Sequence, residues 1–202
     1  MLATRNNGKI LEFRELLAPF GMEVRGLEKF RRIPEVSEDG DSFEANALKK
    51  ARFAADELGL AVLADDSGLV VPALGGAPGV YSSRYAGDGA SDPDNIMKLL
   101  EEMKDIRDRS AFFVCVIAVA IPGGEARIYE GRCDGTVTYE PRGRGGFGYD
   151  PVFFHPPLSA TFAELSGEEK NRVSHRGKAM LALREDFRVL IEWFAGSSDK
   201  YN

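Results

Sequence analysis

Residues that would point to a secreted, zinc-binding or membrane protein are scarce in this sequence. It contains two cysteines, two histidines and one tryptophan, and no apolar run approaches the roughly 20 residues that span a bilayer. The N-terminus also lacks the charged and then apolar pattern of a secretory signal. Cys115 and Cys133 lack the spacing of zinc ligands, so we expect both to be reduced and buried, with a disulfide as the alternative. The protein is therefore expected in the cytoplasm, without a membrane partner.

Positive charge is also in short supply. The chain has 26 Lys and Arg residues against 32 Asp and Glu residues, which gives a formal net charge of -6. Nucleic-acid binding needs a basic surface that displaces counterions, so we expect no nucleic-acid partner. An anionic ligand must instead meet local positive charge. At 202 residues, 44% of them hydrophobic, the chain is long enough for a single folded domain over residues 1–202.

Apolar spacing predicts an alternation of helices and strands. We expect helices over residues 10–20, 41–58, 96–103 and 180–194, and strands over residues 1–4, 60–64, 111–121, 126–133 and 136–139. Asp41 would cap the second helix, with Glu44 completing a capping box. Hairpins interrupt the alternation, so the sheet should be mixed. The Gly- and Ser-containing tail over residues 196–202 should be flexible.

A polar loop follows the first expected strand. It contains Thr4, Arg5, Asn6, Asn7, Gly8 and Lys9. Free backbone amides at the start of the following helix, together with the Lys9 ammonium, favour an anion such as phosphate. A P-loop is excluded, because Ala3 replaces its first glycine and Ile10 replaces its magnesium-binding Ser or Thr. The alternative is a polar turn with a solvated lysine.

An acidic pair, Asp65 and Asp66, directly follows the apolar run over residues 60–64. In α/β proteins ligands bind at the carboxyl ends of strands, which is where this pair is expected. Adjacent carboxylates can hold a divalent cation, or one can hold the metal while the other takes a proton from water. The alternative is an Asp-rich turn in which Gly68 supplies the unusual backbone angles.

Two further segments combine cationic side chains with glycine or a helix start. Residues 143–148 match the dinucleotide-binding pattern G-x-G-x-x-G, but an extended segment follows where that motif requires a helix, so we expect a loop able to hold a base. Ser174, His175 and Arg176 stand at the expected start of the last helix, with Ser174 as its cap. Cations there are unfavourable and indicate an anionic partner, unless the segment is simply solvated.

Taken in order, segments spread over nearly the whole chain resemble the inosine triphosphate pyrophosphatase family. They are residues 4–9, 64–69, 74–79, 83–85, 145–150 and 174–176. The resemblance implies an α/β fold of two lobes with a cleft between them, built on a central mixed, twisted sheet flanked by helices. It also implies a homodimer that hydrolyses noncanonical purine nucleoside triphosphates, namely ITP, dITP and XTP, to the monophosphate and pyrophosphate.

The resemblance also implies roles for individual residues. Phosphate and ribose would bind to Thr4, Arg5, Asn6, Asn7, Gly8, Lys9 and Lys50, and magnesium, or manganese in its place, to Glu38 and Asp66. Ser67 would contact the substrate, and the base and nearby phosphate would be surrounded by Phe147, Gly148, Tyr149, Asp150, Lys170, His175 and Arg176. Asp66 would also accept the proton from water. Arg5 departs from the family, where many members have glycine.

The expected chemistry needs cations and a base more than a nucleophile. Water must attack the α-phosphorus while negative charge gathers on the leaving oxygens. Asp66 or its neighbour Asp65 would deprotonate that water. A 6-keto purine presents an acceptor where adenine presents a donor, so donors from Lys170, Arg176 or loop amides could discriminate between them by roughly 10⁴-fold. No residue can be assigned to the rejection of guanine.

Two other functions fit part of the pattern. The septum-formation-inhibitor-like nucleotide pyrophosphatases act on other nucleotides, and a panel of substrates would separate them from this assignment. A nucleotide-binding sensor would keep the pocket without turnover. The acidic pair together with Glu38 and Lys50 favours an enzyme, because a sensor has little need of a metal site and a base.

Overall fold

The computed structural model describes residues 1–18, 21, 24–27, 34 and 36–198 of the chain. Its α-helices are α1 (Asn7–Leu17), α2 (Phe43–Leu58), α3 (Asp92–Glu102), α4 (Gly167–Val173), α5 (His175–Glu185) and α6 (Phe187–Ser198). Its strands are β1 (Val62–Val70), β2 (Ser110–Ala120), β3 (Ala126–Val137), β4 (Phe153–His155) and β5 (Ala160–Thr161). Short 3₁₀ helices cover Pro72–Leu74, Gly79–Arg84, Asp150–Val152, Pro156–Leu158 and Phe162–Glu164. Within these residues, every helix is too short or too polar to cross a lipid bilayer.

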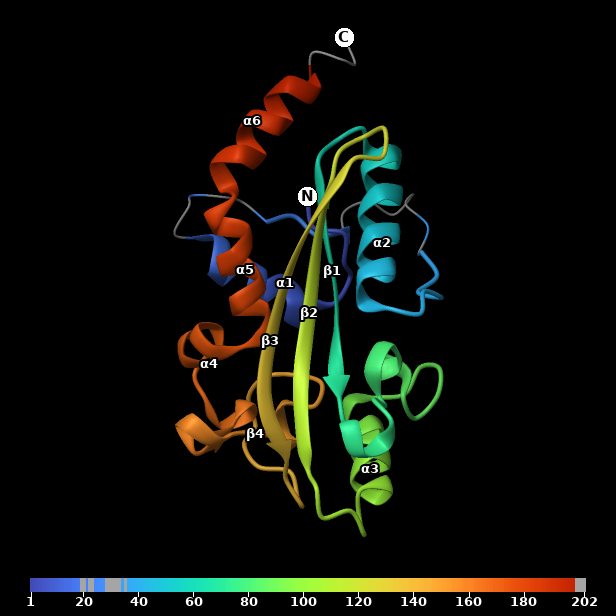
Figure 1. Ribbon diagram of the computed structural model, residues 1–202, viewed down its shortest axis with the longest axis vertical. Coiled ribbons are helices and arrows are strands. Elements are labelled where there is room, and N and C mark those ends of the chain that lie inside the picture. Colours follow the sequence, from blue (N-terminus) through green and yellow to red (C-terminus); the bar gives the residue numbers. More distant parts are fainter. Residues whose placement is uncertain (19–20, 22–23, 28–33, 35, 199–202) are drawn as a thin grey trace. The chain divides into compact units, whose positions relative to one another are not determined.

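The strands form one sheet in the order β1-β2-β3-β4-β5, so each strand pairs with its neighbours in the chain (Figure 1). β3 pairs antiparallel with β4, and β4 pairs antiparallel with β5. Parallel pairing is present as isolated bridges that join Leu2 to Leu63 and to Gly26. The predicted α/β fold with a mixed sheet and flanking helices is confirmed, although the first expected strand amounts to these bridges at Leu2.

The chain divides into two compact units. Unit 1 contains Met1–Asp66, Cys115–Gly131 and Arg176–Asn202, and unit 2 contains Ser67–Val114 and Arg132–His175. Strands β1, β2 and β3 each continue from one unit into the other. One consequence is that neighbouring residues in the sequence, such as His175 and Arg176, belong to different units.

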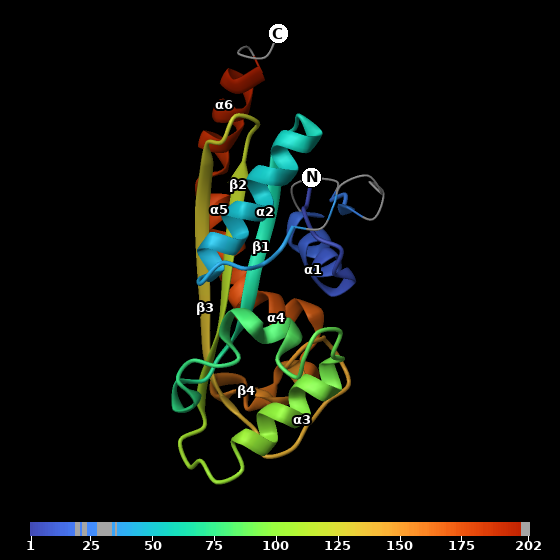
Figure 2. The same ribbon diagram turned by 90° about the vertical axis from the view of Figure 1, so that its right-hand side faces the viewer.

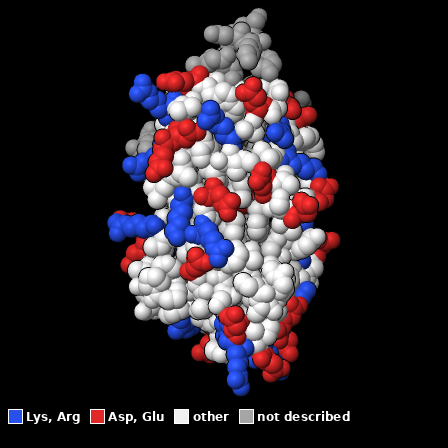
Figure 3. Space-filling model, viewed as in Figure 1, with Lys and Arg blue, Asp and Glu red and all other residues white. Residues whose placement is uncertain are grey.

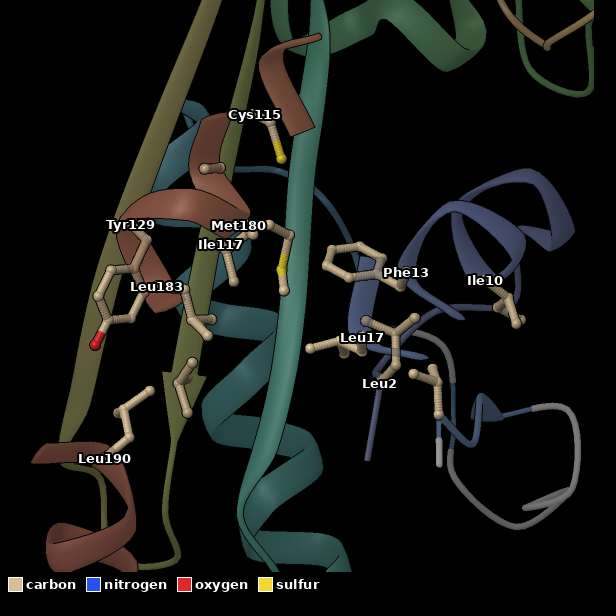
Figure 4. Close-up of a cluster of buried hydrophobic side chains, with 13 residues drawn as sticks. Leu2, Ile10, Phe13, Leu17, Cys115, Ile117, Tyr129, Met180, Leu183 and Leu190 are labelled. Atoms are coloured by element: carbon tan, nitrogen blue, oxygen red, sulfur yellow. The ribbon is translucent and has the colours of Figure 1, made fainter. Parts of the chain in front are cut away.

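Unit 1 has helices on both faces of its strands. Cys115, Ile117 and Val119 of β2 point into one buried cluster with Phe13 of α1 and Leu183 of α5 (Figure 4). The side chains between them point to the opposite face, because successive residues of a strand alternate. On that face lies α2 (Figures 1 and 2). Its buried stripe consists of small side chains that allow a close approach to the sheet: Ala47, Ala51, Ala54 and Ala55.

Unit 2 has a buried cluster of its own, built around aromatic rings. The Phe113 ring of β2 lies 4.6 Å from the Phe153 ring of β4 and 5.9 Å from the Phe162 ring. Leu99 of α3 is fully buried in the same cluster. Aromatic pairs of this kind contribute about 0.5–1.5 kcal/mol beyond the burial of their area. The cluster holds β4 in place and so fixes the 3₁₀ turn before it, which begins at Asp150.

The acidic pair lies inside a strand, which corrects the prediction that a strand over residues 60–64 ends before it. β1 runs from Val62 to Val70, so Asp65 and Asp66 occupy its middle. The strand can continue because both carboxylates are buried in ion pairs with lysine or arginine side chains and do not turn out to water. The alternative of an Asp-rich turn is therefore wrong, and so is the expected end of the strand before Asp65.

Two other predicted elements have different extents. The strands expected over residues 126–133 and 136–139 are one strand, β3, which stays extended beyond Gly135 because Thr136 and Val137 pair with β4. The last helix, expected over residues 180–194, is divided into α5 and α6. The break falls at Asp186, whose carboxylate accepts a hydrogen bond from the Tyr129 hydroxyl at 2.6 Å.

Helix ends also differ from the prediction. α2 begins at Phe43, and its cap is Ser42, whose hydroxyl accepts from the Ala45 amide, rather than Asp41 with Glu44. Ser174 ends α4, a helix that the apolar spacing did not indicate, and it stands directly before α5, which begins at His175. α6 continues to Ser198. Of the tail expected to be flexible, residues 199–202 lie outside the described part of the chain.

Candidate active site

Asp65 and Asp66 have separate sets of partners, because adjacent side chains of β1 point to opposite faces. The Asp65 Oδ2 atom lies 2.9 Å from Lys9 Nζ and 3.1 Å from Arg176 Nη2. The Asp66 Oδ1 atom lies 2.9 Å from Lys50 Nζ, and Asn46 Nδ2 donates to Asp66 Oδ2 at 3.2 Å. Both aspartates are nearly inaccessible to solvent.

Asp65 belongs to a buried ion-pair network. Arg176 is 1% exposed and pairs with Glu12 of α1 as well as with Asp65. Burial alone would raise the pKa of Asp65, but the charges of Lys9, Arg176 and Lys50 outweigh it and hold that pKa well below its usual range. Asp65 is therefore a permanent counterion for these cations and a poor proton acceptor.

Asp66 has the opposite balance. Burial raises its pKa, the charges of Lys50 and Lys9 offset this only in part, and the nearby Glu38 carboxylate raises it further. Lys50 lies between two carboxylates, with its Nζ atom 2.8 Å from Glu38 Oε1 and 2.9 Å from Asp66 Oδ1. Burial would lower the pKa of Lys50, but these carboxylates and Asp65 raise it overall. Of the two aspartates, Asp66 is thus the better proton acceptor.

The carboxylates of Glu38 and Asp66 suit a magnesium ion in the type and number of their donors. Mg²⁺ prefers oxygen ligands and is often bound by one or two carboxylates together with waters and substrate phosphates. Both carboxylates face the same point, the Lys50 ammonium. Among the residues that the structure describes, no set of three or more acidic, His or Cys side chains is arranged to hold a metal ion. Substrate oxygens and water would have to complete the coordination.

The polar segment over residues 4–9 ends in the first turn of α1 and brings Lys9 to the acidic pair. Asn6 caps α1, since its Oδ1 atom accepts from the Lys9 amide at 3.1 Å, and its own amide donates to Thr4 Oγ1 at 3.2 Å. This turn directs Lys9 toward Asp65. Arg5 and Asn7 are exposed. This segment thus places the Lys9 ammonium beside Asp65, while the Lys9 amide is already engaged by the cap.

In unit 2, Asp150 organises the glycine-rich loop. Its Oδ2 atom accepts from the Phe147 amide at 2.9 Å and lies 2.5 Å from Lys170 Nζ, and both charged side chains are buried. Lys170 Nζ also lies 4.8 Å from the centre of the Phe147 ring. Gly146 has a φ of 72°, and a Cβ atom there would lie 2.0 Å from Asp150 Oδ2, so only glycine fits.

Two contacts from elsewhere in unit 2 hold the same loop. The Gly148 amide donates to Asp92 Oδ2 at 2.6 Å, at the first residue of α3. The Tyr149 hydroxyl donates to the Ser82 carbonyl at 2.9 Å. The strand β4 follows shortly after Asp150, which confirms that this glycine pattern does not open a dinucleotide-binding helix.

The predicted site residues fall into two groups. Unit 1 brings together Lys9, Glu38, Lys50, Asp66 and Arg176. Unit 2 brings together Phe147, Gly148, Tyr149, Asp150 and Lys170, and it also contains Ser67, which follows Asp66 in β1. His175, also in unit 2, packs against the core, with its ring 4.6 Å from the Phe113 ring and nearly parallel to it at 11°.

Sequence reasoning missed Glu12, Asn46 and Asp92. Asn46 had a detectable signal, since it is a polar residue beside the buried alanine stripe of α2. Glu12 and Asp92 have no such signal, because an acidic residue on α1 or at the start of α3 reads as a solvated charge. An anionic partner is expected for the segment Ser174–Arg176. For Arg176 the protein itself provides it, in the carboxylates of Asp65 and Glu12.

The chain resembles known proteins over almost its whole length. The Ham1 family model matches residues 1–186. A protein of Desulfotalea psychrophila named dITP/XTP pyrophosphatase is 55% identical over 193 residues, which cover 96% of this chain and 86% of that protein. A protein of the same name from Geobacillus kaustophilus is 49% identical, with 95% of each chain covered.

A solved structure agrees with these matches. The HAM1 protein of Coxiella burnetii superposes with a TM-score of 0.83 at 45% sequence identity, and the match covers 95% of this chain and 97% of that one. At 45% identity the two chains are similar in sequence as well as in fold.

Proposed function

The chain belongs to the Ham1 family, and on that premise we propose that Asp66 is the general base in a magnesium-assisted hydrolysis of nucleoside triphosphates. The substrates are noncanonical purine triphosphates such as ITP, dITP and XTP, and the products are the monophosphate and pyrophosphate. Relatives 49–55% identical to the chain over most of its length are named dITP/XTP pyrophosphatase, which supports this activity.

One observation carries the assignment of the base, namely that the separate partners of Asp65 and Asp66 shift the pKa values of the two carboxyl groups in opposite directions. Asp65 is held ionised by Lys9 and Arg176, whereas the pKa of Asp66 is raised by burial. A general base is most effective when its pKa lies near the working pH, so the upward shift favours Asp66. A carboxylate offers about four lone-pair positions. Lys50 and Asn46 occupy two of those on Asp66, which leaves room for a water molecule.

The remaining residues of unit 1 would handle the phosphates. Water attacks the α-phosphorus, Asp66 takes its proton, and the bond to the pyrophosphate oxygen breaks as negative charge collects there. Lys9 and Lys50 lie at the acidic pair and would neutralise that charge. Glu38 and Asp66 would hold Mg²⁺, or Mn²⁺ in its place, which would neutralise phosphate oxygens when bound.

In unit 2 we assign recognition of the base to Lys170 and the glycine-rich loop. An ammonium carries three N–H donors, and Asp150 accepts one of them. A donor directed at the 6-keto oxygen of hypoxanthine or xanthine would be left facing the 6-amino group of adenine, which is costly. The Phe147 and Gly148 amides already donate to Asp150 and Asp92, and Arg176 pairs with two carboxylates. Lys170 is therefore the favoured donor.

We also propose a homodimer in the cytoplasm. The resemblance to the family supports the dimer. The two cysteines are buried and not joined in a disulfide, which fits a reducing compartment. Across the face shown in Figure 3, basic and acidic side chains are interspersed, so the described residues there form no continuous basic surface for nucleic acid. Light scattering that gives the mass of a single 22.1 kDa chain would contradict the dimer.

A substrate panel tests the activity. Purified protein with magnesium is incubated separately with ITP, XTP, ATP, GTP, CTP and UTP, and released pyrophosphate is measured. We expect ITP and XTP to be hydrolysed far faster than the others, by roughly 10⁴-fold against ATP if Lys170 reads the 6-keto group. The Asp66→Asn protein serves as the control for contaminating hydrolases. Equal rates on all nucleotides, or release of orthophosphate in place of pyrophosphate, would contradict the proposal.

A further inference from the structure

Asn46 is a fully buried polar side chain at the candidate active site. Its relative exposure is 0%, and both ends of its amide are used. The Oδ1 atom accepts from the Gly40 amide at 2.8 Å, and the Nδ2 group donates to Asp66 Oδ2 at 3.2 Å. Burying an amide is favourable only when its hydrogen bonds are made, so these two contacts fix the orientation of the side chain.

Through these contacts Asn46 connects the two carboxylates assigned to the metal. Gly40 lies two residues after Glu38, so the amide of Asn46 ties the segment that carries Glu38 to the Asp66 side chain. Lys50 makes a parallel connection one helical turn later on α2, between Glu38 Oε1 and Asp66 Oδ1. Residues four apart lie on the same face of a helix, so both connections come from one surface of α2.

The two connections respond differently to a cation. The Lys50 ammonium and a divalent metal ion carry charge of the same sign and compete for the same carboxylate oxygens, so binding of the metal weakens the Lys50 connection. The amide of Asn46 is neutral and donates to the other oxygen of Asp66, so its connection persists. A hydrogen bond from a neighbouring group to a metal-binding carboxylate fixes the orientation of that carboxylate.

We propose that Asn46 is a positioning residue that sets the spacing and orientation of Glu38 and Asp66 for a divalent cation. This inference rests on the proposed function of these two carboxylates as metal ligands. Asn46 itself contacts neither the substrate nor the metal in this scheme. Its effect is transmitted through Gly40 on one side and through Asp66 on the other.

Gly40 provides a second way to disturb the same connection. A Cβ atom at this position would lie 2.7 Å from Asn46 Oδ1, which is closer than real Cβ atoms approach such a neighbour. Gly40→Ala should therefore displace the Asn46 side chain while leaving its chemistry intact. Both Gly40→Ala and Asn46→Ala should weaken metal binding if the spacing depends on this contact.

Metal binding is measured directly on the nucleotide-free protein, with Mn²⁺ as the probe and electron paramagnetic resonance of the free ion as the signal. We expect Asn46→Ala to weaken Mn²⁺ binding by about 10-fold or more, the range found when a hydrogen-bond partner of a metal ligand is removed. Gly40→Ala should change binding in the same direction. Asp66→Asn, which removes a ligand, should weaken it at least as much.

Asn95 provides a matched control for a loss of stability. It is also the fourth residue of its helix and is 2% exposed, and its amide also makes two hydrogen bonds, to Ala86 and Ser83. Asn95→Ala should lower the thermal unfolding midpoint about as much as Asn46→Ala does, yet leave Mn²⁺ binding as in the wild type. An equal loss of Mn²⁺ binding in Asn95→Ala would mean general loosening and would overturn the role of Asn46.

The remaining outcomes separate the two proposals. If Asp66→Asn binds Mn²⁺ as well as the wild type, the metal site is wrong, and the role of Asn46 with it. If Asp66→Asn loses binding while Asn46→Ala and Gly40→Ala retain it, the metal site stands and the role of Asn46 alone is overturned.

Discussion

At the scale of single residues, the proton-accepting carboxylate of Asp66 can be tested separately from the size of the side chain. Asp66→Asn keeps the shape of the side chain but removes the group that accepts a proton. We expect turnover of ITP to fall by about 10²–10⁴-fold, the contribution typical of a general base. Because burial raises the pKa of Asp66, its charge at neutral pH is destabilising, so the free energy of unfolding should not decrease. Steady-state kinetics together with urea unfolding measure both, and near-normal turnover would contradict the assignment.

Asp65→Asn should have the opposite profile. The folded-state pKa of Asp65 lies below its ordinary value of 3.8, so the ionised form stabilises the fold at all pH values above about 4. Its removal takes one of two carboxylate partners from the buried Arg176, while the pair with Glu12 is kept. Breaking a buried ion pair in this way costs about 3–5 kcal/mol at pH 7.

The pH dependence checks the sign of this effect. As the pH falls below 3.8, the unfolded chain takes up a proton at Asp65 while the folded protein, with its lower pKa, does not. The stabilisation that the charge supplies therefore declines, and the difference between wild type and Asp65→Asn should shrink. Urea unfolding at pH 7 and pH 3 measures the change. A difference that is the same at both pH values would show that Asp65 acts through its shape and not its charge.

The sequence alone identified the acidic pair but could not divide its roles. Asp65 and Asp66 are adjacent residues of the same type. Their roles differ because β1 continues through them and directs their side chains to opposite faces, whereas the apolar run predicted that the strand ends at residue 64. Arg176 illustrates a second limit. Its position at a helix start correctly indicated an anionic partner, but that partner, Asp65, is 111 residues away in the chain and belongs to the protein. Long-range pairs of this kind leave no local signature.

At the scale of elements, the end of β1 was predicted wrongly because the partners that let it continue are also distant in the chain. Two aspartates followed by serine and glycine are typical of a turn, because carboxylates normally prefer water. In the structure, α1, α2 and α5 supply cations or amides to both carboxylates, and this compensation lets the strand continue. Local propensity is a weak guide where a functional site places charge inside a sheet.

The start of α3 controls the glycine-rich loop through one hydrogen bond, from the Gly148 amide to Asp92. Asp92→Ala should raise the KM for ITP by about fivefold, which corresponds to about 1 kcal/mol for one hydrogen bond, because the loop must then be ordered on binding. Turnover should change little. Asp92→Asn keeps an acceptor oxygen and should restore the KM close to that of the wild type.

Asp94→Ala is the control for a loss of stability in the same helix. Asp94 lies two residues further along α3, where its carboxylate forms a capping box with Ser91. Asp94→Ala should lower the unfolding midpoint, since losing a cap costs about 1 kcal/mol, and leave the KM unchanged. A rise in KM in Asp94→Ala equal to that in Asp92→Ala would mean that the helix as a whole, and not Asp92, holds the loop.

At the scale of the whole molecule, the alternation of helices and strands was predictable, but the division into units was not. Apolar spacing indicated α1, α2, α3 and the long strands, because each has a buried stripe that recurs at its own period. The unit boundaries fall inside β1, β2 and β3 and between His175 and Arg176. Glycine or charge stands at some of these positions, as at Gly131 and Asp66, but it interrupts no element there, since the chain stays extended or helical through them.

Because three strands are shared, we expect the two units to unfold together. Leu99 is fully buried in unit 2, and Leu99→Ala should cost about 2–5 kcal/mol. Trp193, the only tryptophan in the chain, lies in unit 1 and donates to Glu125 at 3.0 Å, so its fluorescence reports on unit 1 alone. In Leu99→Ala the urea midpoint of Trp193 fluorescence should fall and coincide with the midpoint measured by circular dichroism. A Trp193 midpoint that stays at the wild-type value while the circular dichroism transition splits in two would show that the units unfold independently.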